Sequence, residues 1–166
     1  MAMKTMQGDV YTLLPKNHIK VGDKLIFKAD TTKFEDFNLA DVKKKYKVIS
    51  AIPSIDTSVC MLQTREFNNK LVSKYPDVQL ITISRDLPFA LTRGCESFLN
   101  PNHILLSDTN YRDFGNKTNL YFDFNNLLAR SVIVLNENNE VIYLQIVNPV
   151  SSEPNYQEVY TFLDNL

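Results

Sequence analysis

Residues 53–60, PSIDTSVC, decide how the chain folds around them. They follow Tyr46–Ile52, an apolar and β-branched run that is typical of a central strand, and the proline marks its end because it lacks a backbone donor. After them the apolar residues recur at helical spacing, which predicts a helix over Ser58–Lys74. This order of strand, loop and helix places Cys60 in the first turn of the helix.

A cysteine in that position is typical of a reactive thiol. An ordinary cysteine, with a pKa near ~8.5, is mostly protonated at neutral pH. The unpaired N–H groups at a helix start stabilise the thiolate and can lower such a pKa by about two units, or about 2.7 kcal/mol. Asp56 or Thr57 is expected to cap the helix, because either side chain can accept a hydrogen bond from the first N–H groups. The sequence therefore predicts that Cys60 is a nucleophile.

The other elements follow from changes of pattern, and together they predict an α/β fold. A strand, a helix and a second strand, followed by a hairpin and a last helix, form the order of a thioredoxin-like fold. We expect a mixed central sheet flanked by helices, with an amino-terminal strand or hairpin extension. The expected strands are Val10–Leu14, Lys24–Lys28, Tyr46–Ile52, Val78–Ile83, His103–Leu106, Ala129–Leu135 and Val141–Val147, and the expected helices are Phe37–Val42, Ser58–Lys74, Leu87–Phe98 (opened by Asp86), Arg112–Lys117 and Tyr156–Leu166.

Chain length and composition favour one folded domain. The chain has 166 residues, of which 44% are hydrophobic, which is enough for one buried core and too little for two domains. We therefore expect residues 1–166 to form a single domain.

Several classes of function are disfavoured by composition. The net charge is −1 and the basic cluster Lys43–Lys47 has no counterpart elsewhere, so nucleic acid is not an expected partner. With 4 glycines, the chain has no phosphate-cradling G-x-x-x-x-G-K loop, which argues against nucleotide binding. The apolar stretch in residues 1–14 is too short for a secretory signal, and no run approaches membrane-spanning length. We expect a cytoplasmic protein without a membrane partner.

Several segments resemble a known family. Pro53, Thr57 and Cys60 reproduce the P-x-x-x-T-x-x-C signature of peroxiredoxins, and PSIDTSVCMLQTREFN resembles the bacterial thiol peroxidases, an atypical 2-Cys subfamily. The segments ISRDLPFALTRGC, LLARSVIVLNENNEVIY and EPNY follow in the subfamily's order. The resemblance implies a thioredoxin fold and a thiol-dependent peroxidase that reduces hydrogen peroxide and organic hydroperoxides. It also implies that no metal or organic cofactor is required, because sulfur carries the electrons.

The residues around the cysteine fit that chemistry. Attack on an O–O bond needs donors aimed at the sulfur and at the leaving oxygen. Thr57 can bring its hydroxyl over the first helical turn and Pro53 can shield the pocket from water, although without the motif they would be a helix cap and a strand terminator. By the resemblance, Arg130 is the cation that opens a strand beside the catalytic helix, where apolar neighbours leave its charge in need of a partner. Arg65 is a second candidate donor, and the sequence does not rank the two arginines.

Cys95 is the candidate resolving cysteine. A sulfenic acid on Cys60 condenses readily with a second thiol, and a thioredoxin-like protein can reduce the resulting intramolecular disulfide. A disulfide needs Cα atoms within about 7 Å, a condition that two different helices often fail, so part of the fold has to move. Gly94 costs its helix about 1 kcal/mol relative to alanine, which leads us to expect that this helix opens locally. The alternative is that Cys95 is an inert buried side chain.

Several positions depart from the subfamily pattern, among them Ser58, where proline or glycine is common, and the early segment VGDKLIFKA, which lacks the usual Pro-Asp-Phe. Gly94 stands where a bulky aromatic residue is usual, and Arg85 stands where alanine is usual. None of these changes removes a reacting group, so the departures bear on substrate preference more than on reaction type.

Three other readings remain open. The two cysteines with His18 and His103 could hold zinc, but their spacings match no common zinc motif. The chain could be a non-catalytic thioredoxin-fold module for redox sensing or binding. It could also be a peroxidase in which the second cysteine plays no part. The family pattern further suggests a homodimer, for which Phe122 and Phe124 in the run YFDF are candidate contacts.

Overall fold

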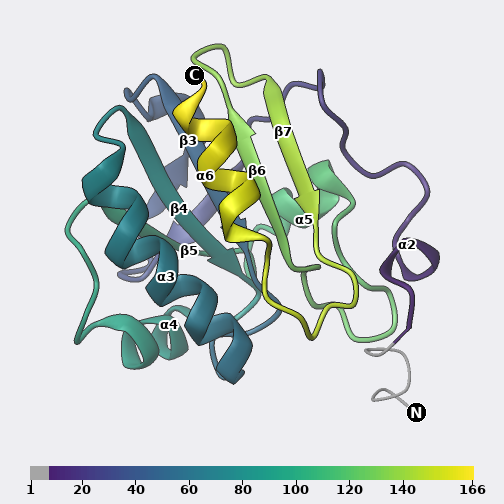
Figure 1. Ribbon diagram of the computed structural model, residues 1–166. Helices are drawn as coiled ribbons and strands as arrows, with labels where there is room; N and C mark the ends of the chain where they lie inside the picture. The colour runs from purple at the N-terminus through teal and green to yellow at the C-terminus, as the bar shows by residue number, and fades with distance from the viewer. Residues whose placement is uncertain (1–7) are drawn as a thin grey trace.

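The computed structural model describes residues 8–166, which are organised around one mixed sheet of seven strands (Figure 1). The strands are β1 (Lys28–Thr31), β2 (Asp36–Asn38), β3 (Tyr46–Ala51), β4 (Val78–Ser84), β5 (His103–Ser107), β6 (Ser131–Leu135) and β7 (Val141–Ile146). The helices are α2 (Val10–Leu13), the 3-10 helix η1 (Leu39–Asp41), α3 (Ser58–Lys74), α4 (Pro88–Cys95), α5 (Asp113–Thr118) and α6 (Tyr156–Asp164). The strand order is β2-β1-β5-β4-β3-β6-β7, and the expected thioredoxin-like fold is confirmed.

The centre of the sheet holds the strands that the sequence predicts most directly. β3 and β4 are parallel, whereas β6 runs antiparallel to β3. Every residue of β4 and of β6 is buried, because helices or loops cover both faces of the sheet. Continuous apolar runs therefore mark the central strands, and the predictions made from those runs are confirmed to within one or two residues at each end.

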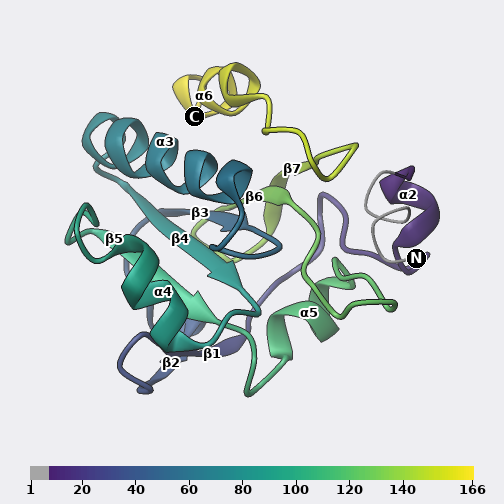
Figure 2. The same cartoon turned by 90° about the horizontal axis from the view of Figure 1, so that it is seen from below.

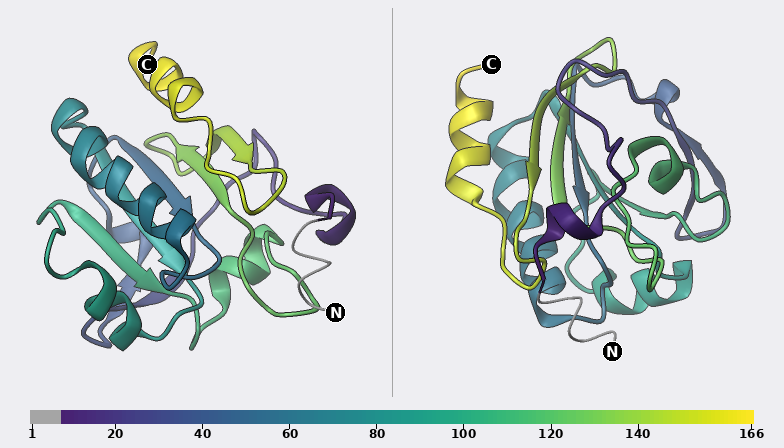
Figure 3. Two further views of the ribbon diagram at one scale, coloured as in Figure 1. Left: turned by 60° about the horizontal axis from the view of Figure 1, so that its bottom comes forward. Right: turned by 90° about the vertical axis from the view of Figure 1, so that its right-hand side faces the viewer.

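Helices lie on both faces of the sheet. α3 and α6 lie side by side on one face, as the view from below shows (Figure 2), and α5 covers the other face (Figure 3). Neighbouring β3 residues divide between the two layers. Val48 packs with Phe67 of α3 and Val159 of α6, whereas Ile49 packs with Phe114 of α5. This alternation follows from the two-residue period of a strand.

The amino-terminal predictions are wrong in detail. Val10–Leu14 was expected to be a strand, but Val10–Leu13 is the short helix α2, because the Asp9 side chain accepts a hydrogen bond from the Tyr11 N–H and caps it. In the expected strand Lys24–Lys28, Lys24 forms an isolated bridge with Glu140 and Lys28 begins β1, while residues 25–27 belong to no strand. The predicted amino-terminal hairpin extension exists as β1 paired antiparallel with β2.

Three predicted helices are shorter than expected, and the last of them, α6, ends at Asp164 instead of Leu166. The segment Phe37–Val42 begins in a strand, since Phe37 pairs with Ala29, and only the turn η1 that follows is helical. The expected helix Leu87–Phe98 ends at Cys95, so this cysteine closes α4 instead of lying inside it. None of the described helices is long and apolar enough to cross a membrane.

His103 generates a prediction about stability. Its ring is 3% exposed, its Nδ1 lies 3.0 Å from Asn68 Oδ1, and its Nε2 lies 2.8 Å from Thr82 Oγ1. Burial lowers the pKa of His103 to about 3. Below its unfolded pKa of ~6.5 the unfolded chain binds the extra proton, so this residue should reduce the free energy of unfolding by about 1.4 kcal/mol per pH unit as the pH falls.

Urea unfolding at pH 7.5 and pH 5.0 tests this effect. We expect wild type to lose more stability between the two pH values than the His103→Gln variant, which has no imidazole at this buried position. An equal loss in both proteins would contradict the prediction.

Candidate active site

The carboxyl end of β3 and the first turn of α3 place Cys60. Thr57 is the N-cap, and its Oγ1 accepts a hydrogen bond from the Cys60 N–H at 3.2 Å. The Thr57 hydroxyl in turn donates to the Ser54 carbonyl at 3.3 Å. The predicted cap therefore exists, and it fixes the backbone of Cys60, whose side chain is fully buried. Pro53 is buried at the end of the strand, one residue after Ile52.

Asp86 holds the loop that carries these residues. Its Oδ2 accepts from the Ile55 N–H at 2.7 Å and from the Ser84 hydroxyl at 2.6 Å, and its Oδ1 accepts from the Ser54 hydroxyl at 2.8 Å. The sequence predicted this aspartate as the cap of α4, but Leu87 occupies the N-cap position and no side chain caps the helix. Because β3 and β4 are parallel, their carboxyl ends meet at one edge of the sheet, and a residue after β4 can bind the loop after β3. Its place just beyond a predicted strand was the signal in the sequence.

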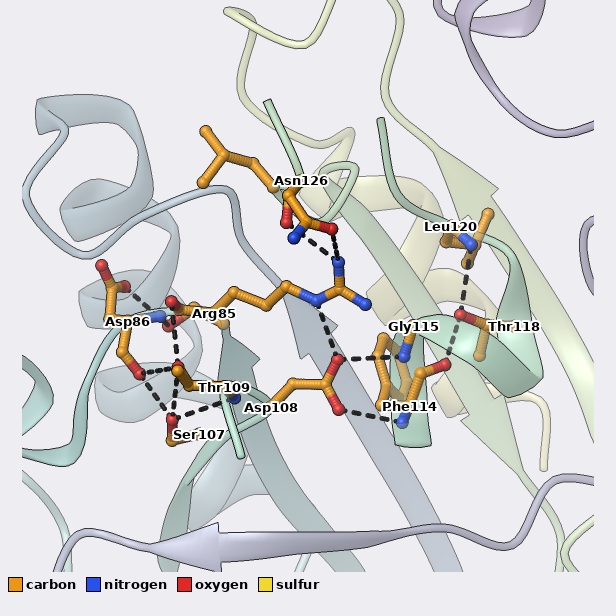
Figure 4. Close-up of polar contacts among 12 residues, drawn as sticks. Arg85, Asp86, Ser107, Asp108, Thr109, Phe114, Gly115, Thr118, Leu120 and Asn126 are labelled. Atoms are coloured by element: carbon orange, nitrogen blue, oxygen red, sulfur yellow. Dashed lines mark hydrogen bonds and ion pairs between the residues drawn. The ribbon is translucent and has the colours of Figure 1, made fainter. Parts of the chain in front are cut away.

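A second network fixes the residue before Asp86 (Figure 4). Arg85, 6% exposed in its side chain, donates from Nε to Asp108 Oδ2 at 3.1 Å and from Nη1 to the Asn126 carbonyl at 3.0 Å. Asp108 also accepts from the backbone N–H groups of Phe114 and Gly115 at the start of α5. The arginine that departs from the subfamily pattern is thus a buried structural residue that ties the end of β4 to α5.

Arg130 lies in the core against α3. It is 3% exposed, and it directly precedes β6, whose Ser131 pairs with Ala51 at the end of β3. Its Nε donates to the Val150 carbonyl at 2.8 Å and its Nη1 donates to Gln63 Oε1 at 2.9 Å. These two acceptors hold the guanidinium beside the helix that carries the cysteine.

Gln63 is a residue that the sequence interpretation missed. It lies three positions after Cys60 on α3, is fully buried, and donates from Nε2 to the Ser50 hydroxyl at 2.7 Å. Its amide therefore connects β3 with the arginine. A glutamine at three-residue spacing from the cysteine faces the same side of the helix, and that spacing was the available signal.

Cys95 shares an apolar cluster with Cys60. Both side chains are fully buried and free, and the cluster also contains Ile52, Ile55, Leu91 and Leu105. Burial raises the pKa of the Cys95 thiol to about 11, the Arg65 charge works in the lowering direction, and the Asp86 charge adds to the increase. In this folded arrangement Cys95 is a protonated thiol at neutral pH.

The two candidate arginines occupy different surroundings. Arg130 contacts Gln63, whereas the Arg65 guanidinium carbon lies 4.1 Å from the centroid of the Phe98 ring. Phe98 belongs to the segment that follows Cys95. The structure therefore brings Arg130 to the helix turn that holds Gln63, and Arg65 to the neighbourhood of the second cysteine.

Close packing explains why a glycine stands at position 94, and the sequence did not reveal this. A Cβ atom built at this position would lie 2.9 Å from Ile55 Cγ1 and 3.5 Å from Met61 Cε. A glycine lets α4 approach the loop before Cys60 and the first turn of α3 closely. The easy opening of this helix, expected from the glycine, stays a prediction.

Metal binding finds no support in residues 8–166, among which no group of three or more His, Cys, Asp or Glu side chains is placed to hold an ion. His103, a ligand in the zinc reading, is engaged by Asn68 and Thr82.

Comparison with known proteins shows the family to which this chain belongs. The redoxin family model matches residues 20–160. The chain is 43% identical over 159 residues to the thiol peroxidase of Bacillus subtilis (strain 168), covering 95% of this chain and 94% of that protein. It is 49% identical over 119 residues to the thiol peroxidase of Staphylococcus epidermidis, covering 72% of this chain and 71% of that protein.

A solved structure agrees with the sequence comparisons. The crystal structure of a peroxiredoxin-like protein from Aquifex aeolicus superposes with a TM-score of 0.81 at 32% identity, covering 92% of this chain and 90% of that chain. The chain therefore belongs to the redoxin family and, within it, to the peroxiredoxins of the bacterial thiol peroxidase type.

Proposed function

We propose that this peroxidase reduces hydrogen peroxide and small organic hydroperoxides with Cys60 as the attacking sulfur. The observation that carries the proposal is the arrangement of α3, in which the capped Cys60 lies one turn before the glutamine that binds Arg130. A nucleophile at a helix start and a buried cation held beside that helix are what attack on an O–O bond requires.

Each residue has a role in the first step. The Cys60 thiolate attacks one peroxide oxygen, the O–O bond breaks, and the other oxygen leaves with the electron pair and takes up a proton. The Arg130 guanidinium stabilises the leaving oxygen, and the Thr57 hydroxyl becomes a second donor when it turns away from the Ser54 carbonyl. Pro53, buried beside Ile52, limits the access of water to the sulfur.

Cys95 completes the cycle in this proposal. Its thiol condenses with the sulfenic acid on Cys60 to form an intramolecular disulfide and water, and a thioredoxin-like protein then reduces the disulfide. Because Cys95 closes α4 inside an apolar cluster, α4 has to open locally before the two sulfurs can bond. A cycle that must be restarted by dithiol reduction suits the cytoplasm, where thiols are kept reduced.

Mass spectrometry after one equivalent of hydroperoxide tests both cysteine roles. Wild type should gain an intramolecular disulfide, and the Cys95→Ser variant should stop at a sulfenic acid on Cys60 because no second thiol remains. The Cys60→Ser variant should remain unmodified and consume no peroxide with thioredoxin and its reductase. A wild type that forms the disulfide but never turns over would indicate a redox-sensing module, and an undiminished rate in Cys95→Ser would remove the resolving role.

Arg130 and Gln63 should act together in the attack step. Replacing Arg130 by Met removes the cation, and the loss of one such donor typically costs about a hundredfold in rate. Gln63→Leu leaves the charge but removes its acceptor, so a smaller loss of rate is expected. Lys70→Met removes an exposed cation from the same helix and serves as the matched control. Stopped-flow peroxide consumption with equal rates in wild type and Arg130→Met would contradict the assignment.

We also propose that residues 1–166 form a single domain. In support, one sheet joins all seven strands that the structure describes.

We further propose that the protein is a homodimer. In support, Phe34 and Phe89 are more than half exposed, and their ring centroids lie 4.9 Å apart. Such an exposed aromatic pair is typical of a contact surface. Phe122, a contact candidate from the sequence, is fully buried and belongs to the core, whereas Phe124 is 41% exposed.

Sedimentation velocity tests the dimer surface. Wild type should sediment as a dimer and Phe89→Asp as a monomer, because the charge cannot be buried without a partner. Phe124→Asp is the comparison variant for the other candidate surface. A wild type that remains monomeric over the micromolar range would contradict the dimer.

A further inference from the structure

Helix α3 continues beyond Cys60 with two residues that contact the chain after Cys95. The guanidinium carbon of Arg65 lies 4.1 Å from the centroid of the Phe98 ring. One turn further, Asn68 donates from Nδ2 to the Phe98 carbonyl at 3.0 Å and accepts from the Asn100 N–H at 2.8 Å. Neither residue takes part in the attack step proposed above.

Phe98 is coupled to Cys95 by the backbone. The N–H groups of Phe98 and Leu99 donate to the Cys95 carbonyl at 3.1 Å and 3.0 Å, so the turn after α4 is continuous with the residue that must move. Phe98 also packs against the apolar cluster that contains both cysteines. Motion of Cys95 out of that cluster therefore disturbs the Phe98 ring.

The two contacts differ in how easily they break. Asn68 is 4% exposed and its Oδ1 also lies 3.0 Å from the ring of His103, which is 3% exposed, so this anchor sits in a buried polar network. Arg65 is exposed on α3, and a cation–π contact on the solvent side is a weak interaction. The Asn68 anchor thus marks a fixed end of the segment, whereas the Arg65 contact can be released.

We propose that Arg65 and Phe98 form a latch that holds the Cys95 turn closed, and that Arg65 is a positioning residue which sets the rate of the resolving step. This inference rests on the function proposed above. In the closed state Cys95 lies in the apolar cluster and α4 is complete. Release of the Phe98 ring lets the turn unwind from the Asn68 anchor and brings the Cys95 sulfur to Cys60.

The step that the latch controls is balanced without an added oxidant. The Cys95 sulfur attacks the sulfur of the Cys60 sulfenic acid, the S–S bond forms and the S–O bond breaks. The oxygen leaves with the electron pair and takes the proton of the Cys95 thiol as water. The Cys60 sulfur is reduced and the Cys95 sulfur is oxidised, and the oxidising equivalents come from the hydroperoxide already consumed.

The latch also affects the competition between disulfide formation and further oxidation of Cys60. While the turn stays closed, a second hydroperoxide can oxidise the sulfenic acid to a sulfinic acid, which leaves the cycle. A weaker latch should therefore give faster disulfide formation and less sulfinic acid per turnover, with an unchanged rate of attack by Cys60.

A double-mutant cycle read by rapid-quench mass spectrometry tests the latch. Arg65→Gln and Phe98→Leu should each raise the rate of disulfide formation about two- to fivefold, the range expected for loss of an exposed cation–π contact. The double variant should be no faster than either single variant, because both remove the same contact. Lys70→Gln, which removes an exposed cation of α3 that pairs with Glu66, should keep the wild-type rate.

Three outcomes would overturn the latch. One is additive effects of the two substitutions, and another is a rate of disulfide formation in Phe98→Leu that is equal to or below that of wild type. The third is a slower resolving step in Arg65→Gln, which would show that Arg65 acts through its charge on Cys95. A wild type that forms neither sulfenic acid nor disulfide would instead overturn the proposed function, so the two failures are distinguishable.

Discussion

The burial of both cysteines in one apolar cluster is the constraint on which the account of this protein depends. Neither sulfur is exposed, and both are free. Because burial raises the pKa of Cys95 to about 11, that thiol is protonated at neutral pH while the fold is closed. In the cycle proposed here the disulfide between the two residues forms after local opening of α4, so the protein alternates between a closed form for attack and an open form for resolution.

The parallel pairing of β3 and β4 explains how one small region serves both steps. Their carboxyl ends meet at the same edge of the sheet, so the loop after β3 carries the attacking cysteine while the chain after β4 becomes α4. Asp86 joins the two by accepting from Ser54 and Ile55 of the first loop just before the helix begins. The attack geometry is thus held by contacts just before α4 begins. The last turn of α4 also meets this loop, through the Arg93–Asp56 ion pair at 2.8 Å and the close packing of Gly94 against Ile55, so the proposed opening has to release these contacts too.

Much of the fold could be predicted from the sequence, and less of the site could. Continuous apolar runs identify central strands, and α3 was predicted with its observed ends because its start combines a cap with a change of period. The strand predicted over Val10–Leu14 was wrong, because the Asp9 cap favours a short helix there more strongly than the short β-branched pattern favours a strand. Asp86 was given the wrong role and Gln63 was missed, because the partners of both side chains are distant in sequence and are brought to them by the sheet. The two arginines could not be ranked for the same reason. Only the folded structure shows that Arg130 contacts Gln63 whereas Arg65 contacts the Phe98 ring.

Amide hydrogen exchange in the reduced protein measures the central claim most directly. Residues 91–98 should exchange through local opening, with a lower free energy than the amides of β3 and β4, which are released only by global unfolding. If residues 91–98 prove as strongly protected as the central strands, the two buried sulfurs cannot meet by local opening, and the account is contradicted.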